Sequence, residues 1–335
     1  MSMLTIWGKV LVWIILLSIN ILGVEVGEYN LEEIRLRDPF IVPVAKEGRY
    51  YIFGTDWRLP GGPGFLSYHS KDLITWKGPY IVFQRPQGFW ADRDYWAPEV
   101  HHYRGKYYMF ASFKAPGVCR GTQILASENP AGPYQCITEK PVTPENWECL
   151  DGTLYLDKKN NPWMVFCHEW VQVNDGEICA MPLSNDLKKA TDKPILLFRA
   201  SEAPWIKRWT PEPGKISKGL VTDGPFLYRI SGGELYMLWS SFGKGGYKLA
   251  LCRSESGELR GPWKQKKTPL YENDGGHGMM FSNFNHEIML VLHQPNRRLL
   301  ERPRLFTVAE KNGTLEIVSW QADKEMCKGI SSELK

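Results

Sequence analysis

Short apolar segments recur in pairs along this chain, and a turn containing Gly or Asn separates the two members of each pair. Aromatic-rich runs at 50–53, 107–110 and 235–238 form the second members of three such pairs. Runs of this length around a turn such as Arg104-Gly105-Lys106 are typical of β-hairpins. No long stretch has the spacing of an amphipathic helix, so the pattern predicts an all-β protein.

The first strand of each predicted hairpin carries a motif with an acidic residue or a histidine. The five motifs are Arg37-Asp38-Pro39-Phe40, Trp96-Ala97-Pro98-Glu99, Leu150-Asp151-Gly152-Thr153, Thr222-Asp223-Gly224-Pro225 and Gly276-His277-Gly278-Met279. They lie about 50 to 70 residues apart, close to the length of a propeller blade with its loops. Four copies continue with a second phrase, at 70–79, 127–134, 184–187 and 254–263. The sequence therefore predicts a five-bladed β-propeller with four-stranded antiparallel blades, as a single domain over residues 25–335.

This architecture has a consequence for chemistry, because the innermost strands of a propeller start around a central channel. Equivalent positions of successive blades converge there, so carboxylates far apart in sequence would share one cavity. The alternative is that Asp-Gly and Asp-Pro only form turns. Their recurrence at one phase of the repeat favours a shared site.

Composition narrows the class of protein without fixing it. The chain has 335 residues, 43% hydrophobic and 13% aromatic, with 31 Gly and 23 Pro. These values exclude a disordered or low-complexity protein and suit a fold with many turns. The net charge is only +4 and both signs are interspersed, so we expect an uncharged partner and no nucleic acid.

The N-terminus has the pattern of a secretory signal. Lys9 precedes a mostly apolar run at 10–24, and acidic Glu25 and Glu28 follow. An uncleaved membrane anchor is the competing interpretation, but the run is short for a span and Ser18 and Asn20 interrupt it. We therefore expect residues 1–24 to be removed and the mature protein, without a stable membrane span, to be secreted or periplasmic.

At the acidic positions the sequence resembles glycoside hydrolase family 43, five-bladed propeller enzymes that act on arabinose- and xylose-containing glycans. The resemblance extends over about residues 34–318 and implies an inverting hydrolase of oligosaccharides or polysaccharides, of the α-L-arabinofuranosidase or β-xylosidase type. By this resemblance Asp38 is the general base, Asp151 tunes the acid and orients the sugar, and Asp223 is the general acid. Gly276-His277-Gly278 resembles the family's late histidine motif near a central calcium ion or buried water, and no cofactor is otherwise required.

The chain departs from the family at the acid position, where Asp223 replaces the usual Glu. Asp is one methylene shorter, so its carboxyl reaches roughly 1.5 Å less far, and misplacement on that scale can cost about 10²-fold in rate. Either the loop of the fourth blade shifts inward or another residue donates the proton. Glu99, Glu169 and Glu202 are the alternative donors, and Asp223 is the preferred one.

The proposed chemistry needs two carboxyl groups in opposite protonation states. Inverting hydrolysis uses a protonated acid and an ionised base about 6.5–9.5 Å apart, with no covalent intermediate. We expect hydrogen bonds to keep the pKa of Asp38 low, and burial beside negative charge to raise that of Asp223.

Sugar recognition needs flat apolar surfaces and polar groups for hydroxyls. The candidate binding residues are Trp57, Trp96, Glu99, Phe242, His277 and Arg302. His277 is also the candidate contact for a central Ca²⁺, although calcium prefers oxygen ligands and one imidazole would make a weak site. The loop at 59–64 is expected to wall the cavity, which slightly favours an exo-acting pocket over an open groove.

Two other functions fit parts of the sequence. Arg37-Asp38-Pro39 and Trp147-Glu148-Cys149 also resemble the sucrose- and fructan-cleaving propellers of families 32 and 68, which retain configuration. The opening motif that carries their nucleophile is missing here. A non-catalytic carbohydrate-binding propeller is the second alternative, because the acid Glu is absent.

Overall fold

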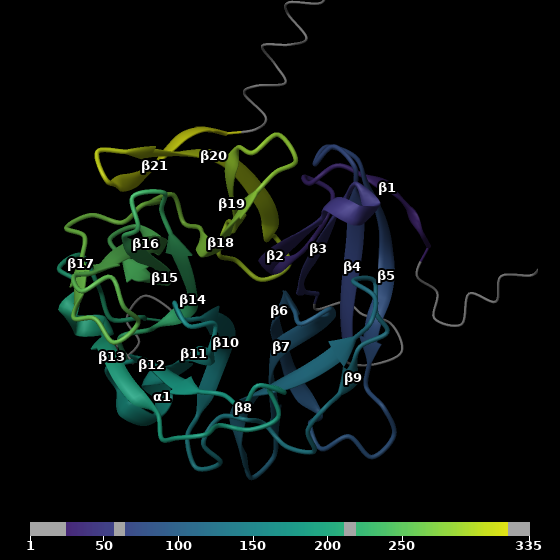
Figure 1. The fold of residues 1–335 in the computed structure, drawn as a ribbon, viewed down its shortest axis with the longest axis horizontal. Coiled ribbons are helices and arrows are strands. Elements are labelled where there is room, and N and C mark those ends of the chain that lie inside the picture. The colour runs from purple at the N-terminus through teal and green to yellow at the C-terminus, as the bar shows by residue number, and fades with distance from the viewer. Residues whose placement is uncertain (1–24, 57–63, 211–218, 321–335) are drawn as a thin grey trace, which may run out of the picture.

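The computed structural model describes residues 25–56, 64–210 and 219–320. The predicted signal segment and Trp57 lie outside these ranges, as does nearly all of the loop expected to wall the cavity. The described chain forms five antiparallel sheets arranged as a ring (Figure 1). This is the predicted five-bladed β-propeller.

Each blade is built from consecutive strands, and the innermost strand comes first. Blade 1 contains β2 (Arg37–Val44), β3 (Arg49–Thr55), β4 (Gly64–Ser70) and β5 (Trp76–Gln84), with β1 (Gly27–Tyr29) added outside β5. Blade 2 contains β6 (Arg93–Tyr103), β7 (Lys106–Ala115), β8 (Val118–Ser127) and β9 (Gln135–Cys136). Blade 3 contains β10 (Cys149–Leu156), β11 (Pro162–His168), β12 (Glu177–Pro182) and β13 (Ile195–Arg199).

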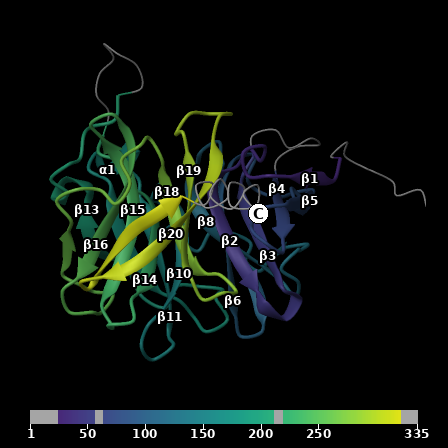
Figure 2. The same ribbon diagram turned by 90° about the horizontal axis from the view of Figure 1, so that it is seen from above.

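Blades 4 and 5 repeat this order. Blade 4 contains β14 (Asp223–Arg229), β15 (Leu235–Gly243), β16 (Gly246–Ser254) and β17 (Trp263–Gln265). Blade 5 contains β18 (Gly276–Ser282), β19 (Ile288–Gln294), β20 (Arg302–Lys311) and β21 (Thr314–Trp320). The described helices are α1 (Trp170–Val173) and two single 3₁₀ turns, Ala45–Glu47 and Ala200–Glu202. A view turned by 90° shows the strands running between the two faces of the ring (Figure 2).

The predicted hairpins form because their turn residues adopt the required backbone conformations. In blade 2 the turn at Arg104 and Gly105 has φ values of 47° and 84°, and Tyr103 pairs with Lys106 on either side of it. Two successive residues with positive φ give the turn whose twist matches that of the strands. Gly at the second position adopts this conformation without steric cost.

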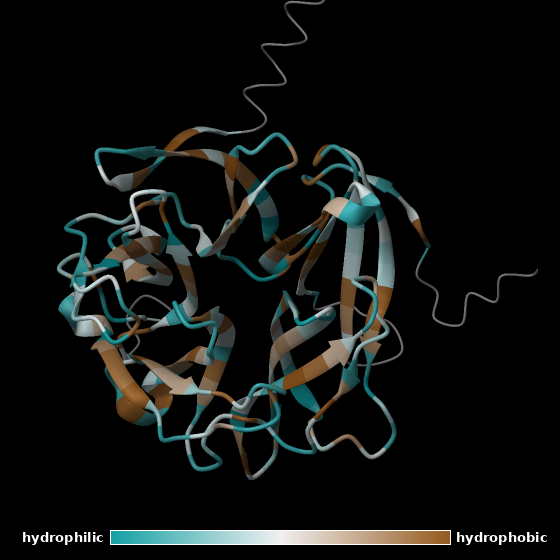
Figure 3. Cartoon of the chain, viewed as in Figure 1, coloured by the Kyte–Doolittle hydropathy of each residue, from teal (hydrophilic) through white to brown (hydrophobic). Residues whose placement is uncertain are grey.

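The hydrophobic core lies between neighbouring sheets rather than at the centre of the ring. Four clusters of buried side chains join adjacent blades, and Trp239 and Phe198 are among the most deeply buried members, in the cluster between blades 3 and 4. Figure 3 shows apolar residues concentrated on the strands and polar residues on the connecting loops. Burying each large apolar side chain contributes about 1.5–3 kcal/mol. Across the centre of the ring, Phe40 of blade 1 also contacts Phe226 of blade 4, with ring centroids 6.1 Å apart.

Candidate active site

Every innermost strand has an irregular backbone at the same place. The pairing with the second strand shifts there, and one residue has a positive φ of 45–54°. These residues are Asp38, Ala97, Asp151, Gly224 and His277. Such a bulge aims a side chain out of the regular alternation of a strand. Asp38, Asp151 and His277 are therefore equivalent residues of blades 1, 3 and 5, all at the inner wall.

This finding corrects the predicted phase in two blades. In blade 2 the equivalent residue is Ala97, and Glu99 lies two positions further along β6. In blade 4 the equivalent residue is Gly224, so Asp223 lies one position before it. The sequence pattern matched the five blades by the position of an acidic residue or histidine. The bulge shows which residues of the five blades are structurally equivalent.

Hydrogen bonds across the blade junctions hold the bulges in place. At four junctions the backbone N–H of the bulge residue donates to a side chain on the second strand of the preceding blade. The pairs are Ala97 to Thr55 at 2.8 Å, Asp151 to Ser112 at 3.0 Å, His277 to Ser240 at 2.7 Å and Asp38 to His293 Nδ1 at 3.3 Å. Cys167 takes the equivalent position on β11, and here Gly224 N–H donates instead to Asp151 Oδ2, at 2.9 Å.

Three of the bulge residues, Asp38, Asp151 and His277, border a cavity of about 390 Å³. Its lining residues are Arg37, Asp38, Trp96, Leu150, Asp151, Glu169, Trp170, Trp209, Val221, Asp223, Phe242, His277 and Asn296. The structure thus brings together the three predicted catalytic aspartates, from blades 1, 3 and 4. Three of the six predicted binding residues, Trp96, Phe242 and His277, also line the cavity.

Asp38 lies among positive and hydrogen-bonding groups. Its Oδ1 is 3.1 Å from His277 Nδ1 and 3.3 Å from Arg37 Nε, and its Oδ2 accepts a hydrogen bond of 3.2 Å from Thr55 Oγ1. Burial alone would raise its pKa, but the charges of His277 and Arg37 outweigh burial and hold the pKa well below its usual range. Asp38 is therefore ionised across the neutral and mildly acidic range.

Asp151 lies on the other side of the same imidazole. Its Oδ2 is 3.7 Å from His277 Nδ1 and accepts the Gly224 N–H. Burial raises the pKa of Asp151 to about 7, and the negative charges of Asp223 and Asp38 add to this effect against the opposing charge of His277. Asp151 can therefore carry a proton near neutral pH.

Asp223 completes the acidic group. Its Oδ2 accepts a hydrogen bond of 2.8 Å from the Tyr247 hydroxyl. Burial raises its pKa, although Tyr247, Arg37 and His277 favour the ionised form. Because Asp151 and Asp223 interact, the proton that they hold near neutral pH belongs to the pair.

Two histidines near Asp38 are in opposite protonation states. Burial disfavours a charge on His277, but Asp38 and Asp151 outweigh it and raise its pKa to about 10. Burial and the charge of Arg37 lower the pKa of His293 to about 3. His293 is therefore neutral, so its Nδ1 accepts the Asp38 N–H while its Nε2 faces Asn296 Oδ1 at 3.2 Å.

Aromatic rings form one wall of the cavity. The rings of Trp170 and Trp209 have centroids 5.7 Å apart, and those of Trp209 and Phe242 are 6.0 Å apart. On another side the Arg120 guanidinium lies 4.3 Å from the centre of the Trp96 ring and pairs with Glu169. Flat apolar faces beside carboxylates suit a ligand with both C–H faces and hydroxyl groups.

Two predicted binding residues do not line this cavity. Glu99 is buried below the bulge and lies 3.3 Å from His101 Nε2. Arg302 lies on β20, the third strand of blade 5, and donates from Nε to the Glu32 carbonyl. Both residues were predicted from their type and their nearness to a motif. Glu99 is absent from the lining because it lies two residues beyond the bulge, and Arg302 because it lies on a third strand, away from the centre of the ring. Trp57 lies outside the described residues.

The alternative proton donors also separate in space. Glu169 lines the cavity and is paired with Arg120, and burial raises its pKa. Glu202 instead accepts the Arg199 backbone N–H at 2.8 Å, at an exposed position. Among these alternatives only Glu169 joins the three aspartates.

Sequence reasoning missed several residues of the site. Arg37, Trp209 and Asn296 line the cavity, and Arg120, Tyr247 and His293 contact lining residues. Arg37 could have been found from its place beside Asp38 in the motif. Arg120 and Trp209 come from a third strand and a long connection, where the repeat gives no signal.

The described residues include no group of three or more His, Cys, Asp or Glu side chains arranged to hold a metal ion. Asp38 and Asp151 face His277 Nδ1, so they are not gathered as the oxygen cage that Ca²⁺ prefers. The residues present do not fit a protein-ligated calcium site. We derive no step from a metal, and the central ion stays a prediction.

An ionised carboxylate and a protonated pair facing one cavity suit acid–base hydrolysis. The chain matches the model for glycosyl hydrolases family 43 over residues 32–326, and it belongs to this family of glycoside hydrolases. Helices in the described ranges are neither long nor apolar enough to cross a membrane.

Three proteins similar to this chain are named as enzymes that act on arabinose-containing glycans. The chain is 24% identical to the extracellular exo-α-(1→5)-L-arabinofuranosidase ArbA of Cellvibrio japonicus, over 74% of this chain and 72% of that protein. It is 26% identical to the extracellular endo-α-(1→5)-L-arabinanase 1 of Bacillus subtilis, over 72% and 71%. The crystal structure of an endo-arabinase from Bacteroides thetaiotaomicron is 43% identical, with a TM-score of 0.79, covering 85% of this chain and 98% of that one.

Proposed function

We propose that this glycoside hydrolase cleaves α-L-arabinofuranosyl linkages of arabinan with inversion of configuration. The observation that carries the proposal is the convergence of Asp38, Asp151 and Asp223 from three blades on one cavity. The choice of arabinan over xylan is supported by the 43% identical endo-arabinase and by the two relatives named for α-(1→5)-arabinan. The similarity to that endo-arabinase also favours endo action over exo action.

Asp38 acts as the general base. Its lowered pKa keeps it ionised, and its hydrogen bond from Thr55 leaves Oδ1 on the His277 side. A water molecule between Asp38 and the anomeric carbon would lose its proton to this carboxylate as it attacks. Because the attack is direct, the sugar product has the opposite anomeric configuration.

Asp223 acts as the general acid, and Asp151 keeps it protonated. Both carboxyl groups are buried in one cavity, so a negative charge on Asp151 raises the cost of ionising Asp223. Asp223 is preferred to Glu169 because the Arg120 cation pairs with Glu169 and favours its ionised form. Asp223 instead accepts a hydrogen bond from the Tyr247 hydroxyl, which also favours the ionised form but less strongly than a directly paired cation does.

Trp170, Trp209 and Phe242 provide the surface for the sugar rings, while Arg37 and Asn296 provide donors and acceptors for hydroxyls. We also propose that the protein is exported. The apolar run at 10–24 and the extracellular relatives support this.

The test is hydrolysis of linear α-(1→5)-arabinan, with arabinoxylan and fructan in parallel, product sizing and NMR of the newly formed anomer. We expect arabinan to be cleaved to oligosaccharides with an inverted anomer. Asp38→Asn and Asp151→Asn should nearly abolish turnover while the protein still folds, as judged by circular dichroism. A retained anomer would contradict the mechanism, and binding without cleavage would favour the carbohydrate-binding alternative.

A further inference from the structure

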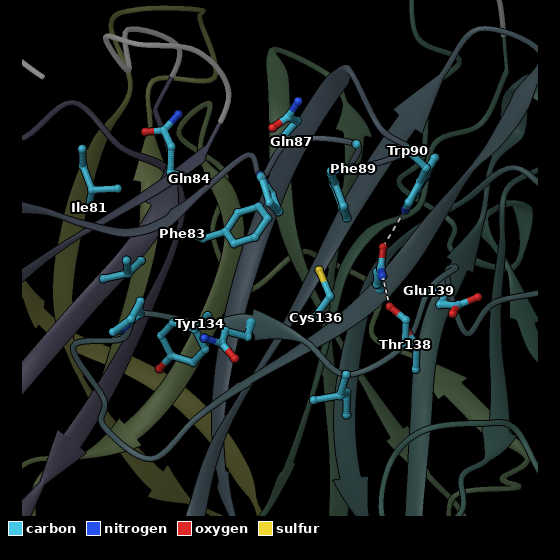
Figure 4. A pocket seen from close by; sticks show the side chains of 17 residues that line it. Ile81, Phe83, Gln84, Gln87, Phe89, Trp90, Tyr134, Cys136, Thr138 and Glu139 are labelled. Atoms are coloured by element: carbon cyan, nitrogen blue, oxygen red, sulfur yellow. Dashed lines mark hydrogen bonds between the residues drawn. The ribbon is translucent and has the colours of Figure 1, made fainter.

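A second, larger cavity lies on the outer wall between blades 1 and 2. Its volume is about 870 Å³, compared with about 390 Å³ for the active-site cavity. We call it the outer groove, and it is formed by residues 81–84 and 86–90, Gln123 and residues 133–139. Figure 4 shows Phe83, Phe89, Trp90 and Tyr134 around the same space, with Gln84 and Gln87 at its edge.

The lining of the outer groove suits an uncharged, hydroxyl-rich ligand. Glu139 is the only lining residue with a formal charge among those described there. The partly exposed rings of Phe89 and Trp90 offer flat apolar faces, and the exposed Gln87 and Gln135 offer amide groups that both donate and accept hydrogen bonds. Such a lining is typical of a sugar-binding surface. It contains no cation among its described residues, whereas an anionic ligand would require one.

The groove is also organised in advance of binding. Trp90 Nε1 donates a hydrogen bond of 2.6 Å to Gln123 Oε1, and Gln123 Nε2 donates one of 2.5 Å to the Thr138 carbonyl (Figure 4). The polar atom of the indole is therefore satisfied inside the protein while the ring remains partly exposed. A ring fixed in this way loses little conformational entropy when a ligand stacks on it.

The outer groove and the active-site cavity share two structural elements. The connection between β5 and β6 carries Phe89 and Trp90 in the groove and leads directly into Trp96 at the cavity. Strand β8 carries Arg120 over the Trp96 ring and Gln123 in the groove. These two positions are about 10 Å apart along the strand but face opposite sides of the blade 2 sheet, since Arg120 pairs with Glu169 and Gln123 bonds to Trp90. A chain of several sugars leaving the cavity would therefore reach the groove by passing over the end of this sheet.

We infer that the outer groove is a second binding site for an uncharged pentose-containing glycan chain. It holds a part of the polymer that is not being cleaved. The inference rests on the proposed function for the class of glycan. It assigns the groove to polymer capture, so short substrates that fill only the active-site cavity gain nothing from it.

The test is affinity electrophoresis of Asp38→Asn protein in native gels containing linear arabinan, with Trp90→Ala added in one sample and Gln135→Ala in another. Gln135 is exposed at the groove, so its loss should not disturb folding. Trp163→Ala is the matched control. Trp163, on β11 of blade 3, is also partly exposed, but it lies outside the groove and packs against Arg260 of blade 4. We expect roughly 3- to 10-fold weaker retention for Trp90→Ala, a smaller loss for Gln135→Ala and none for the control.

Kinetics with an active Asp38 separate this inference from the proposed function. Trp90→Ala should raise KM for arabinan and leave kcat/KM for α-(1→5)-arabinotriose unchanged. Equal retention of both groove variants and the control would overturn the inference even if arabinan is cleaved. A change in oligomeric state without a change in retention would assign the groove to a second copy of the chain and also overturn it. Failure of the wild type to cleave either substrate refutes the proposed function, while retention still decides the role of the groove.

Discussion

Asp38 and Asp151 are buried almost equally, with 6% and 5% of their surface exposed, yet their pKa values move in opposite directions. Asp38 lies 3.3 Å from Arg37 Nε and 3.1 Å from His277 Nδ1. Asp151 lies farther from the same nitrogen, at 3.7 Å, and although it accepts the Gly224 N–H, the negative charges of Asp223 and Asp38 lie close to it. Charge placement, and not burial, therefore sets the difference between the pKa values of these two carboxyl groups.

These shifts predict the pH dependence of hydrolysis. Asp38 must be ionised, so activity should fall only below the usual Asp range because its pKa is lowered. The Asp151–Asp223 pair must hold a proton, so activity should fall as the pH rises through about 7. The measurement is kcat/KM for arabinan from pH 3 to 9. Arg37→Gln should bring an acidic limb into this range, and a variant profile without such a limb would show that Arg37 does not set the pKa of Asp38.

A change of leaving group distinguishes the two possible proton donors. Asp223→Asn should reduce kcat/KM for arabinan about 10²- to 10⁴-fold. The loss should be much smaller with a dinitrophenyl arabinofuranoside, because its leaving group needs no proton. Glu169→Gln should lower both rates by a similar factor, as expected for a binding residue. The reverse pattern would assign the acid to Glu169.

Four of the five innermost strands are held by the second strand of the preceding blade. Ser112 on β7 and Ser240 on β15 accept the N–H groups of Asp151 and His277. These hydroxyls sit where the bulges need an acceptor, since a buried N–H without a partner costs about 1–3 kcal/mol. The blade junction is thus the unit that positions catalytic side chains.

Ser112→Ala tests this positioning. It should lower kcat for arabinan about 10-fold or more, because Asp151 loses the acceptor that fixes its backbone, and it should lower KM little. Cys167→Ala is the matched control, since Cys167 has the equivalent place at a junction where Gly224 bonds to Asp151 instead. The control should retain kcat, and an equal loss in both variants would indicate a general packing effect.

The elements were predictable from the sequence because hairpin turns and alternating apolar runs are local signals. The repeat also placed Asp38, Asp151 and Asp223 at one cavity. It failed for Glu99, because a bulge changes the strand phase and Trp-Ala-Pro-Glu has Ala97 at the inner position. Arg120 and Trp209 escaped because their approach depends on how blades pack, which no local pattern records.

At the scale of the whole molecule, the ring closes without a shared strand among the described residues. Every sheet is built from consecutive strands, so blades 5 and 1 meet through side chains and packing. Arg37 Nη1 donates to Asn296 Oδ1, and His293 accepts the Asp38 N–H. Buried apolar residues of both blades, including Phe281, join the same cluster.

Asn296→Ala should therefore weaken both the closure and the site. We expect a loss of about 1–2 kcal/mol in the free energy of unfolding, because Arg37 loses a buried partner, and a large loss of kcat. Urea titrations followed by activity and by circular dichroism would measure both effects. Unchanged midpoints in the two titrations would show that Asn296 takes no part in closure.

The seam between blades 5 and 1 also shapes how this enzyme would fail. A molecule in which blades 5 and 1 have separated would retain its complete sheets. Its far-UV circular dichroism would therefore match that of the native protein. Asp38, however, would have lost His293 as the acceptor of its N–H. Arg37 beside it would have lost its contact with Asn296 in blade 5. Heat or denaturant should therefore produce silent inactivation, a population with full ellipticity and no turnover, before any blade melts.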